Sequence, residues 1–320
     1  MISFLIDIAF PLIFPLILVG CLVIILIKGF LNDYPERELM TLDDFIKDWL
    51  IDHGQGHKVE QQFEQMKKDP AGGLYMPITY GGAKACIKIG LTPNLVSFIN
   101  LICSFFIFYG VVMAGQGHGL DLFSKQPGYG SWFILLGFLV LFTGIIDGID
   151  GGIARLLDIK SKSGAWFDNV IDRVSDILML VGLIPGTILV ILDLNLSFKW
   201  LVWTNIFIIL IYEYMRARHE GLGLHETKPY IGERITRVLV ISSFFVVYGI
   251  SSFTVFLTSL FFPDLTSLWE ASHTFVITWI MLIFQIVLLV IMIISSIQLG
   301  NYSYKTLKKL DEGNQKIDSK

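Results

Sequence analysis

Charged residues are scarce in this chain: they make up 16% of its 320 residues, whereas soluble domains carry about 25%. Hydrophobic residues make up 54%, and so few polar groups could not cover that much apolar surface in a soluble fold. A basic excess is also lacking, since the net charge is −4, and this argues against a nucleic-acid partner. The three cysteines show no CxxC spacing, so neither a zinc site nor a disulfide framework is indicated. The composition instead predicts an integral membrane protein surrounded by lipid.

The sequence contains many long apolar runs. A spanning helix needs about 20 mostly apolar residues, and helices satisfy the backbone where lipid offers no hydrogen bonds. The predicted fold is therefore all-α, a polytopic membrane helical bundle. Seven stretches are long enough to span, at about 5–28, 95–114, 131–154, 166–192, 198–215, 236–262 and 274–298.

Lysine and arginine placement predicts how these spans are oriented, because cytoplasmic loops carry the basic residues. With the N-terminus outside and the C-terminus inside, all but two of the 24 basic residues fall on the cytoplasmic side. Only Lys125 and Lys199 fall in outer loops. We therefore expect seven spans in the N-out, C-in orientation.

The chain divides into four parts. Within the second part, Thr41 and Asp44 have the spacing of a capping box, so a helix is expected to follow Thr41. A second, charged helix is predicted from about Val59 to Lys68, and this part either packs on the core or has a regulatory or partner-binding role. The parts are an N-terminal transmembrane helix (1–28), a cytoplasmic or interfacial amphipathic helical segment (29–90), a six-span domain (91–300) and a polar cytoplasmic tail (301–320).

Four aspartates stand where the third and fourth predicted spans meet. Asp147 and Asp150 are three residues apart, and Asp168 and Asp172 are four apart, so each pair shares a helix face. The connection between the two helices, roughly 156–163, is short, so they are expected to form an antiparallel hairpin in which the pairs face each other. Converging carboxylates repel unless cations bind between them. Their oxygen ligands favour Mg²⁺, Mn²⁺ or Ca²⁺ over zinc.

Small residues surround these acids and would let a flat group or a diphosphate approach the backbone. Arg155 adds a fixed positive charge suited to phosphate oxygens. The alternative is that the aspartates form ion pairs with Arg155, Lys160 and Arg173, but ion pairing does not require small residues between the acids. The small residues are Gly151, Gly152, Ala154 and Gly164.

The stretch 147–172 fills every fixed position of DxxDGxxAR-x8-GxxxDxxxD. It thereby resembles the CDP-alcohol phosphatidyltransferases. The resemblance implies a six-helix catalytic core over about 90–300, to which the first span is an addition. It also implies a membrane enzyme of phospholipid biosynthesis, commonly a homodimer. Such an enzyme moves a phosphatidyl-type group from a CDP-linked lipid to a small alcohol on the cytoplasmic face and releases CMP.

The resemblance also implies roles for single residues. Two divalent ions, Mg²⁺ or Mn²⁺, would be held by Asp147, Asp150 and Asp168, with Asp172 as the fourth carboxylate. Asp172 would also be the catalytic base. The CDP-binding residues would be Asp147, Asp150, Gly151, Ala154, Arg155 and Gly164, together with Asn94 from the motif Leu91-Thr92-Pro93-Asn94 that opens the second span.

A basic run resembles the pattern of prokaryotic members that use a phosphorylated inositol acceptor. It reads Tyr214-Met-Arg216-Ala-Arg218, followed by Glu233-Arg234. Arg216, Arg218 and Arg234 would bind the phosphate of the acceptor. Inositol phosphate is the favoured acceptor, while glycerol phosphate, serine and other alcohols stay open. The nearby His219 and His225 are expected to be surface groups.

Two other functions compete with this interpretation. A divalent-cation transporter would place acids near the bilayer midplane, commonly in repeated halves. Here the acids cluster near one end of their helices and no repeat is present. A non-catalytic scaffold of the same fold would be expected to have lost an aspartate, and this chain keeps all four.

Overall fold

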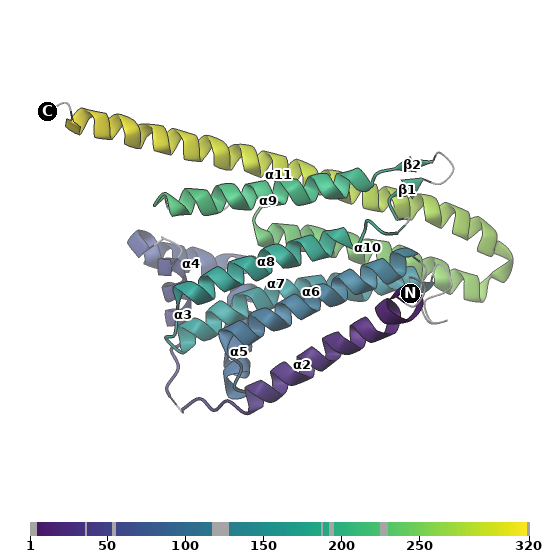
Figure 1. The fold of residues 1–320 in the computed structure, drawn as a ribbon, viewed down its shortest axis with the longest axis horizontal. Coiled ribbons are helices and arrows are strands. Elements are labelled where there is room, and N and C mark those ends of the chain that lie inside the picture. Colours follow the sequence, from purple (N-terminus) through teal and green to yellow (C-terminus); the bar gives the residue numbers. More distant parts are fainter. Residues whose placement is uncertain are drawn as a thin grey trace.

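The computed structural model describes residues 5–35, 37–52, 56–116, 128–186, 188–191, 195–224 and 230–318. Helices account for most of these residues, which confirms the predicted all-α class (Figure 1). The strands among the described residues are the short antiparallel pair β1 (Val190–Ile191) and β2 (Leu196–Ser197).

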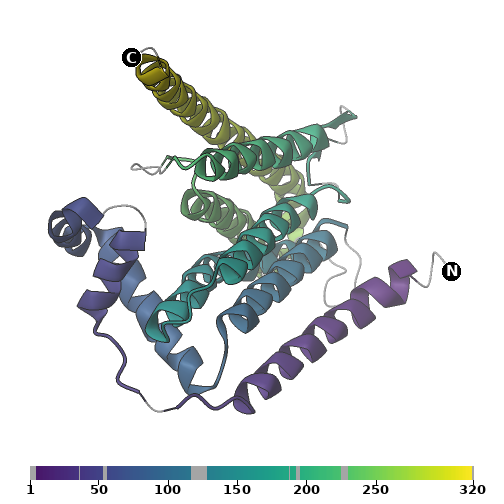
Figure 2. The ribbon, with the colours of Figure 1, turned by 60° about the vertical axis from the view of Figure 1, so that its left-hand side comes forward.

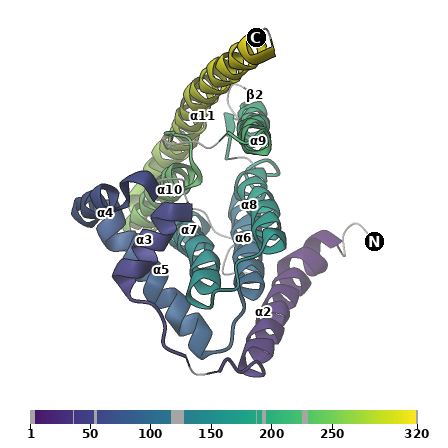
Figure 3. The same cartoon turned by 90° about the vertical axis from the view of Figure 1, so that its left-hand side faces the viewer.

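Six long helices form the main bundle and lie side by side along the long axis of the molecule (Figures 1 and 3). α7 packs against both α6 and α10, α8 packs against α6, and α11 packs against α9 and α10. An apolar core holds the six together. The helices are α6 (Pro93–Gln116), α7 (Trp132–Leu156), α8 (Lys162–Val181), α9 (Lys199–Gly221), α10 (Arg234–Phe261) and α11 (Thr266–Asp318), with the short 3₁₀ helices η5 (Gly128–Ser131) and η7 (Pro263–Leu265) before α7 and α11.

The N-terminal helix stands apart from this bundle and touches it along α6 (Figure 2). It consists of the π-helical η1 (Leu5–Ile13) and α2 (Phe14–Phe30). This helix and four of the bundle helices are each long and apolar enough to cross a membrane. Within the described part of the chain, the five candidate spans are Ala9–Phe30, Pro93–Gly115, Trp132–Leu156, Arg234–Phe261 and Phe275–Glu312.

The two remaining predicted spans correspond to α8 and α9, whose acidic and basic residues lower their hydropathy. The fourth predicted span, 166–192, was too long, because α8 ends at Val181. Gly182 and Pro185 follow in a turn, and proline cannot donate a helical hydrogen bond. Seven spans and the N-out orientation stay predictions.

Beyond the end of α2, the described residues within 29–90 contain three α-helices, one more than predicted. α3 (Leu42–Leu50) begins at Thr41, whose hydroxyl accepts a hydrogen bond from the Asp44 amide at 3.2 Å, so the predicted cap is confirmed. After the 3₁₀ turn η3 (Gly56–Lys58), α4 (Val59–Lys68) has the predicted bounds. The unpredicted helix is α5 (Pro70–Lys88). Pro70 stops α4 but also starts α5, since the first position of a helix needs no amide hydrogen.

The segment 29–90 packs on the bundle through a second apolar core. Phe45 of α3 and Ala83 of α5 are fully buried in it against Ile153 of α7. Gly152 makes this close approach possible, because a Cβ there would lie 3.1 Å from the Ala83 Cβ. Gly152 was predicted to make room for a phosphate; that interpretation was wrong, because it faces α5.

Most of the predicted polar tail, 301–320, is helical, because α11 continues through Asp318. His219 was predicted wrongly as a surface group. Its side chain is buried between α9 and α11, where Nδ1 lies 2.8 Å from the Ser303 hydroxyl. The helical extension of α11 covers it. His225 lies outside the described residues.

Gly90 joins α5 to α6 and contacts the end of α2. It has φ +74°, and a Cβ there would lie 2.1 Å from the Gly29 carbonyl oxygen and 2.2 Å from that of Asn32. We expect Gly90→Ala to destabilise the protein by about 1–3 kcal/mol, because alanine disfavours this backbone conformation and its methyl group has no room. Thermal unfolding in detergent measures the effect. Gly81→Ala in α5, where a Cβ meets nothing within 4 Å, is the control and is expected to be neutral or slightly stabilising.

Candidate active site

The α7–α8 hairpin builds the candidate site. α7 ends at Leu156 and α8 begins after Ser161, whose hydroxyl accepts a hydrogen bond from the Gly164 amide at 3.0 Å. The predicted short connection is confirmed. This tight turn places the last turns of α7 beside the first turns of α8, so the two aspartate pairs meet.

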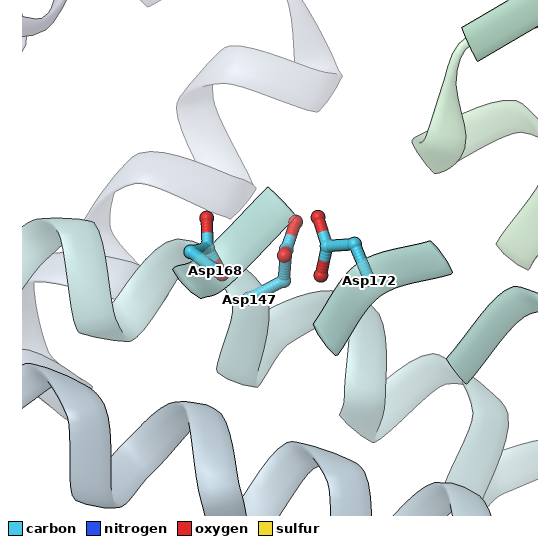
Figure 4. A group of neighbouring side chains, drawn as sticks. All are labelled: Asp147, Asp168 and Asp172. Atoms are coloured by element: carbon cyan, nitrogen blue, oxygen red, sulfur yellow. The ribbon is translucent and has the colours of Figure 1, made fainter. Parts of the chain in front are cut away.

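Three carboxylates converge in this hairpin. Asp147, Asp168 and Asp172 each offer an oxygen, and these oxygens all lie within 4.8 Å of one another. Figure 4 shows the Asp147 carboxylate between those of Asp168 and Asp172. Asp150 is buried one turn further along α7, where its Oδ2 accepts a hydrogen bond from the Ser97 hydroxyl at 2.5 Å. The structure thus brings three of the four predicted metal ligands together and places the fourth next to them.

A cavity of about 510 Å³ adjoins this cluster. The volume is typical of a small-molecule site. The N-terminal ends of α6 and α8 border it, and such ends favour anions. Six of the seven predicted CDP-binding residues line it, while Asp147 lies in the carboxylate cluster instead. The six are Asn94, Asp150, Gly151, Ala154, Arg155 and Gly164.

The sequence profile of the CDP-alcohol phosphatidyltransferases matches residues 90–302, well over half of the chain. The chain belongs to this family. The match begins at the turn before α6 and ends within α11, so it covers five of the six long helices of the bundle in full and the sixth, α11, as far as residue 302. The family match does not include helices α2 to α5. This transferase therefore carries an N-terminal addition that packs on its family core.

Curated relatives with different names match parts of the chain. An archaetidylinositol phosphate synthase of Pyrococcus horikoshii is 26% identical over 162 residues, which are 49% of this chain and 71% of that protein. One of Methanothermobacter thermautotrophicus is 31% identical over 37% of this chain and 56% of its own length. A CDP-diacylglycerol–serine O-phosphatidyltransferase of Mycobacterium tuberculosis is 32% identical over 28% of this chain and 30% of its own length.

Solved structures of a phosphatidylinositol phosphate synthase from Mycobacterium tuberculosis are also similar. The complex with manganese and citrate is 20% identical, with a TM-score of 0.48, and covers 71% of this chain and 88% of that one. The complex with CDP-DAG is 21% identical, with a TM-score of 0.47, and covers 71% and 94%.

The residues of the carboxylate cluster suit a divalent metal. All three offer carboxylate oxygens, the donors that Mg²⁺ and Mn²⁺ prefer. Asp168 Oδ1 is buried and has no hydrogen-bond partner among the residues that the structure describes. A buried anionic oxygen of this kind is costly unless a cation binds it. The transferase thus has a donor set that fits hard cations.

Of the three arginines that were predicted to bind the acceptor, Arg234 lies in the carboxylate cluster. It is the first residue of α10, and its Nη1 donates hydrogen bonds to both Asp147 and Asp172. Its Nη2 is buried and finds no acceptor within the described part of the chain. The other two predicted arginines are elsewhere: Arg216 forms an ion pair with Glu220 at 3.3 Å, and Arg218 is exposed.

A buried ion-pair network behind the cluster was missed in the sequence. Arg237 of α10 is 1% exposed and donates hydrogen bonds to Asp176 and to Glu213, both at 2.8 Å. Asp176 is thus an ion-pair partner of Arg237. Glu213 also forms an ion pair with Arg173 at 2.5 Å, so the network ties α8, α9 and α10 together. The sequence did contain one indication of this network, because Glu213 is an acidic residue within the apolar run of α9.

Proposed function

We propose that this transferase moves a phosphatidyl-type group from a CDP-linked lipid to a small alcohol and releases CMP. One observation carries the proposal: Asp168 belongs both to the carboxylate cluster and to the wall of the cavity. A nucleotide diphosphate bound in the cavity therefore has its phosphates beside the carboxylates. The Gly-rich turn of α7 and the start of α8 supply backbone room and a favourable helix end for those phosphates.

The donor site consists of cavity residues and two divalent ions. Asp147, Asp150 and Asp168 would hold the ions, with Asp172 as the fourth carboxylate. Bound ions of this kind neutralise the diphosphate and stabilise CMP as a leaving group. Arg155 at the cavity wall donates to a phosphate oxygen, and Asn94 contacts the nucleotide.

The acceptor hydroxyl approaches from the side of Asp172. Its oxygen attacks the lipid-linked phosphorus and its proton passes to a carboxylate oxygen of Asp172, while the bond between that phosphorus and the CMP oxygen breaks. Arg234 lies directly beside Asp172, and its unpaired Nη2 suits the phosphate of the acceptor. Arg216 and Arg218 lie outside the carboxylate cluster, and we propose that their charge attracts the phosphorylated acceptor toward it.

We propose inositol phosphate as the acceptor. The arginines favour a phosphorylated alcohol, and two relatives are named archaetidylinositol phosphate synthases. Glycerol phosphate shares the phosphate and is the second candidate. Serine is the acceptor named for a third relative, but it has no phosphate for Arg234 to bind.

We further propose that the enzyme is a homodimer with seven spans, N-out and C-in, and with its active site on the cytoplasmic face. The helix ends expected in the cytoplasm all lie toward one end of the molecule, which supports placing them on the same side of the membrane (Figure 1). They are the C-terminal ends of α2, α7, α9 and α11 and the N-terminal ends of α6, α8 and α10.

An acceptor screen tests the function. The purified full chain, with Mn²⁺ or Mg²⁺ and an ester- or ether-linked CDP-lipid, is incubated with inositol phosphate, glycerol phosphate, inositol or serine. We expect CMP release and a new lipid product with inositol phosphate, at least about tenfold faster than with free inositol, because a charge-assisted bond to the phosphate is lost without it. Turnover of serine or free inositol alone would contradict the acceptor assignment. Release of CMP with none of these alcohols would contradict the proposed function.

A further inference from the structure

One aspartate from outside the family core lines the donor cavity, and a second shares its contacts with Arg155 and Lys160. Asp48 is in α3 and Asp52 follows it. They are four residues apart and face the turn between α7 and α8. Asp52 lines the cavity, although the family match begins only at residue 90. The N-terminal addition therefore supplies part of the wall of the predicted nucleotide site.

These two carboxylates hold both cations of the cavity. Asp52 Oδ2 accepts hydrogen bonds from Arg155 Nε at 3.1 Å, from Arg155 Nη2 at 3.0 Å and from Lys160 Nζ at 2.9 Å. Asp48 Oδ2 accepts from Lys160 Nζ at 2.6 Å and lies 3.4 Å from Arg155 Nε. One edge of the Arg155 guanidinium is thus fixed by the addition.

The opposite nitrogen of Arg155 faces the cavity floor. Its Nη1 takes no part in the contacts with Asp48 and Asp52, and it lies over Gly151, where a Cβ would be 3.6 Å from it. The signature glycine therefore leaves open the space in front of Nη1. A phosphate bound against Gly151 would contact Nη1, while Asp52 still binds the other edge of the Arg155 guanidinium.

The segment that carries Asp48 and Asp52 is itself held in place by buried side chains. Phe45 is fully buried beneath α3, and the Arg155 guanidinium carbon lies 6.0 Å from the centre of its ring. Leu50, two residues before Asp52, is also buried. Burial raises the pKa of Asp52, but the hydrogen bonds and charges of Lys160 and Arg155 outweigh it, so the pKa is lowered overall. Asp52 is therefore anionic at neutral pH.

We propose that Asp52, supported by Asp48, is a positioning residue of the donor site, which holds Arg155 and Lys160 ready for the phosphates of the CDP-linked lipid. The inference rests on the proposed function, and it gives the N-terminal addition a part in donor binding. The opposite role, in which Asp52 blocks the cations and must leave, fits the contacts less well because Nη1 stays available.

The kinetics of Asp52→Asn test this role. We expect the KM for the CDP-linked lipid to rise about tenfold, because the amide cannot make charge-assisted bonds to both cations. The kcat and the KM of the acceptor should change less than about twofold, since the reacting groups are untouched. Asp52→Glu should recover most of the donor affinity. An unchanged donor KM would overturn the proposal, and a lowered one would assign Asp52 the blocking role instead.

Asp43→Asn is the matched control. It removes the same charge from the same N-terminal addition, but Asp43 pairs with Lys67 of α4 at 3.1 Å and not with Arg155. Its donor KM should equal that of the wild type. If both variants raise the KM alike, the effect comes from loosening α3 and the proposal fails.

A double-mutant cycle separates positioning from general damage. In an Arg155→Gln background, Asp52→Asn should raise the donor KM by less than half of its effect in the wild type, because the group that it positions is gone. Fully additive effects would contradict action through Arg155. Wild-type CMP release in the same assay tests the proposed function separately. An active wild type with an insensitive Asp52→Asn overturns this inference alone, whereas an inactive wild type overturns both.

Discussion

Asp172→Asn is expected to lower kcat by about 10²–10⁴-fold, the usual contribution of general acid–base catalysis, while the KM for the CDP-linked donor changes less than about threefold. An amide cannot take the hydroxyl proton at neutral pH, yet it keeps the shape of the carboxylate and one oxygen. Asp172 also lies further from the donor cavity than Asp168, which lines it. Initial rates of CMP release and direct binding of the CDP-linked lipid measure the two effects separately.

Asp158→Asn is the control for this experiment. Asp158 is exposed in the turn of the same hairpin, with φ +51°, a conformation that asparagine also adopts readily. It should keep wild-type kcat. Equal turnover of the wild type and Asp172→Asn would remove the base assignment and would leave Asp172 as a structural partner of Arg234.

Asp147→Asn is expected to weaken metal and donor binding together. Its carboxylate lies between those of Asp168 and Asp172, so it would be a central ligand of the proposed metal site (Figure 4). Loss of a ligand should shift the Mn²⁺ or Mg²⁺ concentration for half-maximal activity upward at least about tenfold. Titration of CMP release with metal, and of donor binding at fixed metal, measures the shift.

Metal removal completes this prediction. A chelator should abolish CMP release by the wild type, and added Mn²⁺ or Mg²⁺ should restore it. Arg234 donates a hydrogen bond to Asp147, so Arg234→Gln distinguishes loss of the arginine from loss of the carboxylate. This variant should raise the KM of a phosphorylated acceptor and leave the metal requirement unchanged. Chelator-resistant activity, or wild-type metal dependence in Asp147→Asn, would contradict a metal site at this cluster.

Local spacing explains why the centre of the site could be predicted. Aspartates three or four residues apart share a helix face, and a connection of a few residues forces the two faces together. The cluster of Asp147, Asp168 and Asp172 follows from these two facts. The cap at Thr41 and the end of α4 at Lys68 were also predictable, because they depend on residues within one turn.

Contacts between distant segments explain what the sequence did not reveal. Gly152 stands beside Gly151 in one motif, yet it faces Ala83 of α5 while Gly151 faces the cavity. His219 was read as exposed because α11 was not expected to continue as a helix over it. Arg234 was grouped with Arg216 by sequence, but only the packing of α10 on α7 brings it to the aspartates.

The scarcity of charge and the long apolar runs were enough to determine a helical membrane protein, because lipid leaves the backbone no other way to satisfy its hydrogen bonds. The signature was enough to identify the family and the carboxylate cluster, because both depend on helical spacing within 26 residues. The tertiary structure alone decided the surroundings of that cluster. Which cation meets which acid, as with Arg155 and Asp52, depends on helices that pack together from separate parts of the chain, and no local pattern encodes that packing.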